Sequence, residues 1–145
     1  MPQLPRILVA ATVAALLATP VASAHAAIAP TLSGPSNGKK ISKGKAFTFK
    51  AKLDASSGAS GVFIIVSKSK KKGADGLIDD SQYMRSMKQS GSTYSHKAES
   101  YPALSSHWLN RKGKWYWQVY AIDCSDGTED CNIESSIRSF TIRLR

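Results

Sequence analysis

The stretch KGKWYWQVYAIDC, residues 112–124, alternates between two sets of side chains in a way that decides the fold. Successive side chains of a β-strand point to opposite faces of its sheet. One set, which contains Trp115, Trp117 and Val119, is apolar throughout, so we predict that it faces a hydrophobic core. An aromatic side chain of this kind buries about 150–250 Å², so two indoles supply a large part of the core.

The second set of this strand contains Tyr116, Gln118 and Tyr120, and it is mixed in polarity. These side chains are expected to form an outward stripe, and two interpretations stay open. Tyrosines suit interfaces, so the stripe is a possible ligand surface for a sugar or a protein partner. Tyrosines are also common on the outer face of a sheet because of their β-propensity, and we favour this second interpretation.

The remainder of the chain after about residue 28 has no long apolar pattern of helical period, and short alternating runs separated by turn residues dominate. In residues 46–53, Phe47 and Phe49 share one face, and Lys50 and Lys52 share the other. Further strands are expected within residues 27–44, 62–68, 77–89, 91–100 and 135–145, with a crossing connection at 101–113. About seven strands of this kind predict an all-β, antiparallel Ig-like sandwich.

The last third of the chain resembles the end of a fibronectin type III-like domain, in which a Leu and a short turn precede an aromatic-x-x-x-Val strand. The matching residues are Leu109, Gly113, Trp115 and Val119, and a closing strand runs to Ile142. Residues 30–51, PTLSGPSNGKKISKGKAFTFKA, are similar to the first two strands of such domains. The resemblance covers most of residues 28–145, and the domains that the chain resembles are those of small exported bacterial proteins.

This resemblance implies a fibronectin type III-like sandwich over residues 28–145 that serves as a binding or spacer module without catalysis. Trp115 stands where such domains usually have a ring with a hydroxyl group. The hydroxyl normally makes a hydrogen bond back to the backbone at the corner before the strand. A buried indole N–H usually finds a partner, so Trp115 is able to replace that bond with a backbone carbonyl.

Residues 1–24 have the pattern of a secretory signal peptide. Arg6 precedes a continuous apolar run at residues 7–18, and small residues at Ala22 and Ala24 follow as a cleavage site. We expect cleavage after Ala24, with cleavage after Ala26 as the alternative, and an uncleaved anchor is the competing interpretation. The mature protein is then secreted or extracellular, with no membrane span.

The two cysteines, Cys124 and Cys131, both lie outside the signal peptide. An even pair in an exported protein predicts a disulfide bond. Because the bond closes a short loop, we expect it to contribute about 2–3 kcal/mol to stability.

The chain is basic, with a net charge of +10, and its lysines form two groups in the sequence. One group is a turn, and the other lies around residues 39–45, to which Lys50 and Lys52 add an outward strand face. These positions either attract an anionic polymer or are solvated turns and edges, and we favour solvation. A nucleic acid is not expected as the designed partner of an exported protein. The turn group consists of Lys68, Lys70, Lys71 and Lys72.

The sequence contains no nucleophile elbow, phosphate-binding loop or zinc-ligand spacing, so we predict that the protein is not an enzyme and needs no cofactor or metal. The acidic turn at residues 123–131 is interpreted as a solvated hairpin tip rather than a calcium site. We therefore predict a secreted, non-catalytic module that binds a protein or cell-envelope component or has a structural role. The alternative is a carbohydrate- or anionic-polymer-binding module that uses the outward tyrosines and the lysine groups.

Overall fold

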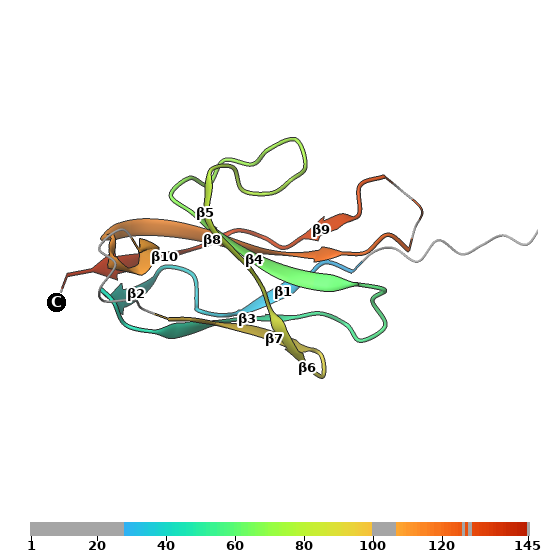
Figure 1. Cartoon of the computed structure of the whole chain (residues 1–145), viewed down its shortest axis with the longest axis horizontal. Coiled ribbons are helices and arrows are strands. Elements are labelled where there is room, and N and C mark those ends of the chain that lie inside the picture. The colour runs from blue at the N-terminus through green and yellow to red at the C-terminus, as the bar shows by residue number, and fades with distance from the viewer. Residues whose placement is uncertain (1–27, 100–106, 126, 128, 145) are drawn as a thin grey trace, which may run out of the picture.

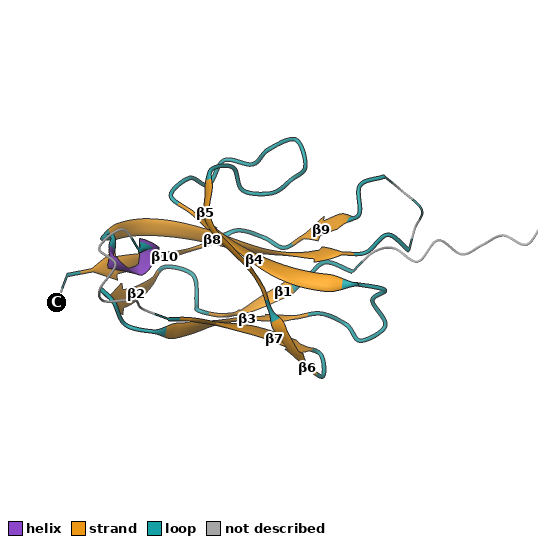
Figure 2. Ribbon diagram, viewed as in Figure 1, coloured by secondary structure: helices purple, strands orange, loops and turns teal. Residues whose placement is uncertain are grey.

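The computed structural model describes residues 28–99, 107–125, 127 and 129–144, and they form a sandwich of two β-sheets (Figures 1 and 2). The expected signal peptide at residues 1–24 lies outside the described residues, as does the first part of the expected crossing connection, residues 101–106. A 3₁₀ turn, η1 (Trp108–Asn110), ends that connection. No helix of the described residues is long and apolar enough to cross a membrane.

The first sheet has four strands in the order β1-β3-β7-β6, and all its pairings are antiparallel. In β3, Phe49 and Ala51 are buried while Lys50 and Lys52 are exposed, as the alternation predicts. The four strands are β1 (Thr31–Gly34), β3 (Phe47–Lys52), β6 (Lys88–Ser90) and β7 (Thr93–Ala98).

The second sheet has six strands in the order β2-β10-β8-β4-β5, and β9 adds to the end of β8. All its pairings are antiparallel except one, since β2 runs parallel to β10. The predicted single edge strand in residues 27–44 is therefore two strands that belong to different sheets. The six strands are β2 (Lys39–Ser42), β4 (Gly61–Ser67), β5 (Ser81–Ser86), β8 (Gly113–Ile122), β9 (Asn132–Glu134) and β10 (Arg138–Arg143).

The chain crosses repeatedly between the two sheets, and the shortest crossing lies between β5 and β6, where only Met87 separates the two strands. The order β1-β3-β7-β6 corresponds to strands A-B-E-D of an Ig-type domain, and β10-β8-β4 corresponds to G-F-C. The chain therefore folds as an Ig-like, fibronectin type III-like β-sandwich. The described residues form ten strands instead of about seven, because two segments that were each expected to form one strand contain two, β1 with β2 and β5 with β6, and because β9 is a short addition.

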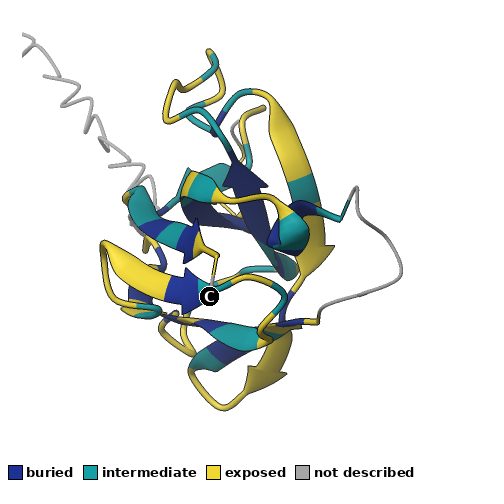
Figure 3. Ribbon diagram, turned by 90° about the vertical axis from the view of Figure 1, so that its left-hand side faces the viewer, coloured by how far each residue is buried: buried dark blue, intermediate teal, exposed yellow. Residues whose placement is uncertain are grey.

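The core lies between the sheets and is dominated by aromatic rings. Trp115, Trp117 and Val119 of β8 are fully buried there. The Trp117 ring lies 5.0 Å from that of Phe49 on the opposite sheet, and the Trp115 ring lies 5.6 Å from that of Trp108 in η1. Buried and exposed positions alternate along β3, which presents one face to this core, whereas most positions of β4 and β8 are buried (Figure 3).

Candidate binding surfaces

The face of β8 that was predicted to point outward is covered. Gln118 is 0% exposed and Tyr120 is 8% exposed, while Tyr116 is half-buried. A second, smaller cluster of apolar side chains covers this side of the six-stranded sheet, with Ile78 of the β4–β5 connection at its centre. The predicted outward stripe is therefore wrong for Gln118 and Tyr120, because a connection far away in sequence packs over them (Figure 1).

The buried Gln118 side chain holds this cover in place. Its Oε1 accepts a hydrogen bond from the Ile78 backbone N–H at 3.0 Å. Its Nε2 donates to the carbonyl oxygens of Gly76 at 3.2 Å and Ser135 at 3.1 Å. A buried polar group is stable only when it is hydrogen-bonded, and here one amide joins three segments of the chain.

Tyr120 is also a packing residue. Its ring stacks on Phe63 of β4 with centroids 5.3 Å apart, and its hydroxyl donates to the Met84 sulfur at 3.6 Å. Burial raises the pKa of the Tyr120 hydroxyl above its usual value. A sequence signal for this arrangement exists in β4, where Phe63 and Ile65 point to the same side as Tyr120, since a strand that is apolar on both faces is covered on both faces.

Three of the four lysines in the group at residues 68–72 contact neighbouring groups of the protein. Lys68 Nζ lies 4.1 Å from the centre of the Trp115 ring and donates to the Lys112 carbonyl at 3.0 Å. Burial lowers the pKa of Lys68, and the nearby charge of Arg111 lowers it further.

Two members of the group face carboxylates. Lys71 lies 3.9 Å from Asp79 and Lys72 lies 3.7 Å from Glu134. Lys70 is exposed and lines a shallow hollow with Tyr116. The structure thus does not bring the four lysines together with Gln118 and Tyr120 into one open surface.

In the described residues, the outward-facing side chains of β3, β6 and β7 are lysines, serines and threonines, and they are exposed or half-buried. The register places Lys50 of β3 beside Ser95 of β7, and Ser95 beside Lys88 of β6. Lys97 of β7 lies beside Thr48, one pleat away. We call the surface formed by Lys50, Lys52, Lys88 and Lys97 the lysine face.

The alternation of residues 46–53 predicts the outward positions of Lys50 and Lys52, whereas those of Lys88 and Lys97 were not predicted. Lys97 has a local signal in the sequence, since the alternation of residues 93–98 places it on the same side as Thr93 and Ser95. Lys88 has no such signal, since β6 is only three residues long and is exposed throughout.

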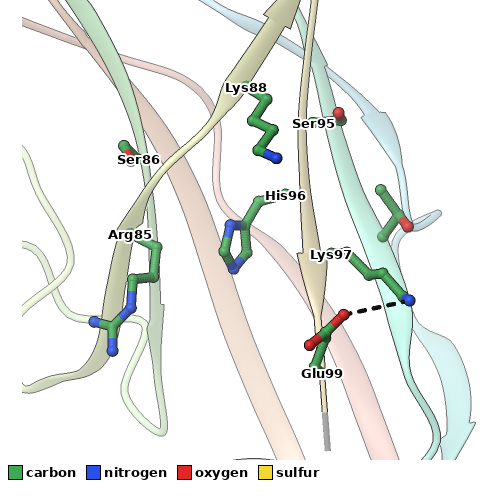
Figure 4. A pocket seen from close by; sticks show the side chains of 8 residues that line it. Arg85, Ser86, Lys88, Ser95, His96, Lys97 and Glu99 are labelled. Carbon is green, nitrogen blue, oxygen red and sulfur yellow. Dashed lines mark ion pairs between the residues drawn. The ribbon is translucent and has the colours of Figure 1, made fainter.

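A hollow of about 570 Å³ adjoins the lysine face where the chain passes from β5 to β6. Figure 4 shows the side chains of Arg85, Lys88 and Lys97 around it, from three different strands. His96 stands at its inner side, and its Nε2 lies 2.7 Å from the Tyr83 hydroxyl.

Burial is the main influence on His96 and lowers the pKa of its imidazole below 6.5. The charge of Arg85 acts in the same direction, while the Ser86 backbone and Glu99 oppose it. Burial thus favours the neutral form of the His96 ring, which interacts with Tyr83 and so links β5 to β7.

Comparisons with known proteins support no narrower assignment. No known protein family and no curated protein sequence matches the chain. Among solved structures, it is similar to the fibronectin(III)-like modules of Clostridium thermocellum CbhA, at 17% identity and a TM-score of 0.49. It is also similar to the C. elegans twitchin kinase region, at 17% identity and a TM-score of 0.34.

The matches span 80% and 81% of this chain but only 46% and 16% of the respective solved chains. The strand order of the described residues defines the class, which is an Ig-like, fibronectin type III-like sandwich. A second apolar cluster covers the outer face of its six-stranded sheet.

Proposed function

We propose that this protein is a secreted, non-catalytic β-sandwich module that binds a protein or a cell-envelope component, or has a structural role outside the membrane. The observation that carries the proposal is the contrast between the two outer faces. The outer face of the six-stranded sheet is covered by the segment to which Gln118 is hydrogen-bonded. The outer face of the four-stranded sheet carries polar side chains, among them the exposed Lys50, Lys52 and Lys88.

Two further features support an exported module. Cys124 and Cys131 form a disulfide bond with their Cα atoms 4.6 Å apart. Disulfide bonds persist in oxidising compartments, which is where the predicted signal peptide would deliver the chain. The disulfide closes the loop between β8 and β9 at one end of the sandwich.

A non-catalytic role fits the way both described histidines are used. His96 interacts with Tyr83 across two strands. His107 caps η1, since its Nδ1 accepts a hydrogen bond from the Leu109 backbone N–H at 3.3 Å. Each imidazole therefore has a structural task that engages a ring nitrogen.

The test is to express the whole chain in a bacterial host and to recover it from the medium and the cell fractions. We expect export, a mature N-terminus after Ala24 or Ala26, and retention of the mature protein by isolated cell-envelope material. Hydrolysis of substrates in a broad enzyme screen, or a full-length chain that stays in the cytoplasm, would contradict the proposal.

The second candidate is a carbohydrate- or anionic-polymer-binding module. The burial of Gln118 and Tyr120 gives no support to a tyrosine surface on β8. The lysine face supports this candidate instead, since it supplies charge and hydroxyl groups over several strands.

A further inference from the structure

From the lysine face we infer a binding site for a linear anionic polysaccharide that lies across β3, β7 and β6. This inference rests on the proposed function, because it names the ligand class and the surface of the same module. It also moves the expected site away from the tyrosines of β8 to the opposite sheet.

The register of the strands fixes the spacing of the Cα atoms of these lysines. Lys50 and Lys52 are two residues apart on one strand, so their Cα atoms are separated by about 7 Å. Lys50 and Lys88 are joined through Ser95 across two strand spacings, which is about 10 Å. Neighbouring positive charges at this spacing match a polymer that carries a repeated negative charge along its length.

The lysines of this face are available for binding. Among the described residues, no carboxylate lies within ion-pair distance of Lys50, Lys52 or Lys88. Lys97 is paired with Glu99 at 3.3 Å, but both side chains are more than half exposed, so the pair is weak.

The rest of the lysine face favours a polysaccharide over other anionic partners. Thr48, Thr93 and Ser95 place hydroxyl groups between the lysines, and these can exchange hydrogen bonds with sugar hydroxyls. The rings of Phe49 and Tyr94 point into the core, so they provide no stacking platform for the bases of a single-stranded nucleic acid.

A membrane surface is disfavoured by the scarcity of apolar anchors. Among the described residues, the exposed large apolar side chains are Ile28, Met84 and Leu144, and only Ile28, which lines a hollow with Lys52, lies beside the lysine face.

The hollow beside the lysine face extends the site toward the second sheet. Arg85 lies on its far side and adds a guanidinium group to the lysine charges. A polymer that lies across β3, β7 and β6 can continue into this hollow toward Arg85 of β5. The long axis of the bound polymer is therefore expected to run across the strands.

The experiment compares fluorescently labelled dextran sulfate with uncharged dextran of the same length. We expect the exported wild-type protein to bind dextran sulfate, with an affinity that falls as salt rises, and not to bind dextran. The double variant Lys50→Glu/Lys88→Glu should bind at least about tenfold more weakly, because two contacts become repulsive.

The matched control is Lys39→Glu/Lys40→Glu, which changes the net charge equally but lies in β2 at the edge of the other sheet. It should retain affinity within about twofold, since these positions are outside the site. The variant Lys50→Gln/Lys88→Gln should show an intermediate loss, and near-ultraviolet circular dichroism of the buried tryptophans verifies the fold of each protein.

Three results would overturn the inference: no binding of dextran sulfate by the wild type, an equal loss in the β2 control, or tighter binding of single-stranded DNA or phosphatidylglycerol vesicles at matched charge. The first result would leave the proposed module intact if export and envelope retention hold. Catalytic turnover in the enzyme screen would overturn the proposed function instead.

Discussion

The indole Nε1 of Trp115 donates a hydrogen bond to the backbone carbonyl of Arg111, four residues upstream, at 3.0 Å. This bond closes the corner between η1 and β8, where Ig-type domains commonly use a tyrosine hydroxyl for the same purpose. Tryptophan therefore replaces tyrosine without loss of the corner bond. The ring also packs against Trp108 in η1, so the corner is fixed by both the bond and the core.

Trp115→Phe should destabilise the protein more than Trp117→Phe. Both indoles are fully buried, so both substitutions leave a similar cavity. Only Trp115 loses a hydrogen bond, because the Trp117 Nε1 has no acceptor among the described residues. We expect a difference of about 1 kcal/mol in the free energy of unfolding, measured by urea titration. Equal losses would show that the corner bond adds no stability.

Gln118→Leu should loosen the cover of the six-stranded sheet. The substitution removes three hydrogen bonds and leaves the Ile78 N–H buried without its acceptor, which costs about 2–3 kcal/mol. Urea titration measures the loss, and hydrogen exchange at the Ile78 amide should become faster. Gln89→Leu on exposed β6 is the control and should change neither quantity appreciably. Unchanged exchange at Ile78 would contradict the role assigned to Gln118.

The core face of β8 could be predicted from the sequence because strand alternation is a local property. Trp115 and Trp117 share a face wherever the strand lies, and an apolar face must be buried. The cover over Gln118 could not be predicted in the same way, since it depends on Ile78, which is 40 residues away in the chain. The segment that supplies Ile78 contains many lysines and glycines, and by composition it resembles a solvated turn.

The lysine face illustrates the same limit. The alternation of β3 predicts that Lys50 and Lys52 point outward, and they do. Their proximity to Lys88 depends on the pairing of β7 with both β3 and β6. The order of the strands in a sheet cannot be predicted from amino-acid composition. Long-range register therefore determines the candidate site, while local periodicity determines only the direction of each side chain.

Removal of the disulfide should lower stability without loss of the sandwich. Cys124 and Cys131 are separated by seven positions, so Cys124→Ser/Cys131→Ser should cost about 2–3 kcal/mol of unfolding free energy. The effect should be strongest near β9, where the Asp123 N–H donates to the Cys131 carbonyl at 2.8 Å. Thermal unfolding with and without a reductant measures the loss, and the double variant should be insensitive to the reductant. A wild-type midpoint that does not change on reduction would contradict this expectation.

Acidification should destabilise the protein through His96. Burial lowers the pKa of His96 in the folded state below its ordinary value of 6.5, so the unfolded chain binds more protons at this site as the pH falls below 6.5. The contribution of His96 to the free energy of unfolding is therefore fully present above pH 6.5 and decreases as the pH falls below that value. Stability decreases because protonation removes the neutral ring that contacts Tyr83. The charge of Arg85 opposes this protonation, and the charge of Glu99 favours it.

Urea titrations at pH 7.5 and pH 5 measure this effect as the difference between two unfolding free energies. His96→Gln should reduce that difference, although it lowers stability at both pH values because the contact with Tyr83 changes. Burial also lowers the pKa of His107, so some acid sensitivity should persist in His96→Gln and decrease further when His107→Gln is added. A pH difference that is the same in the wild type and in both variants would assign the acid sensitivity to other groups.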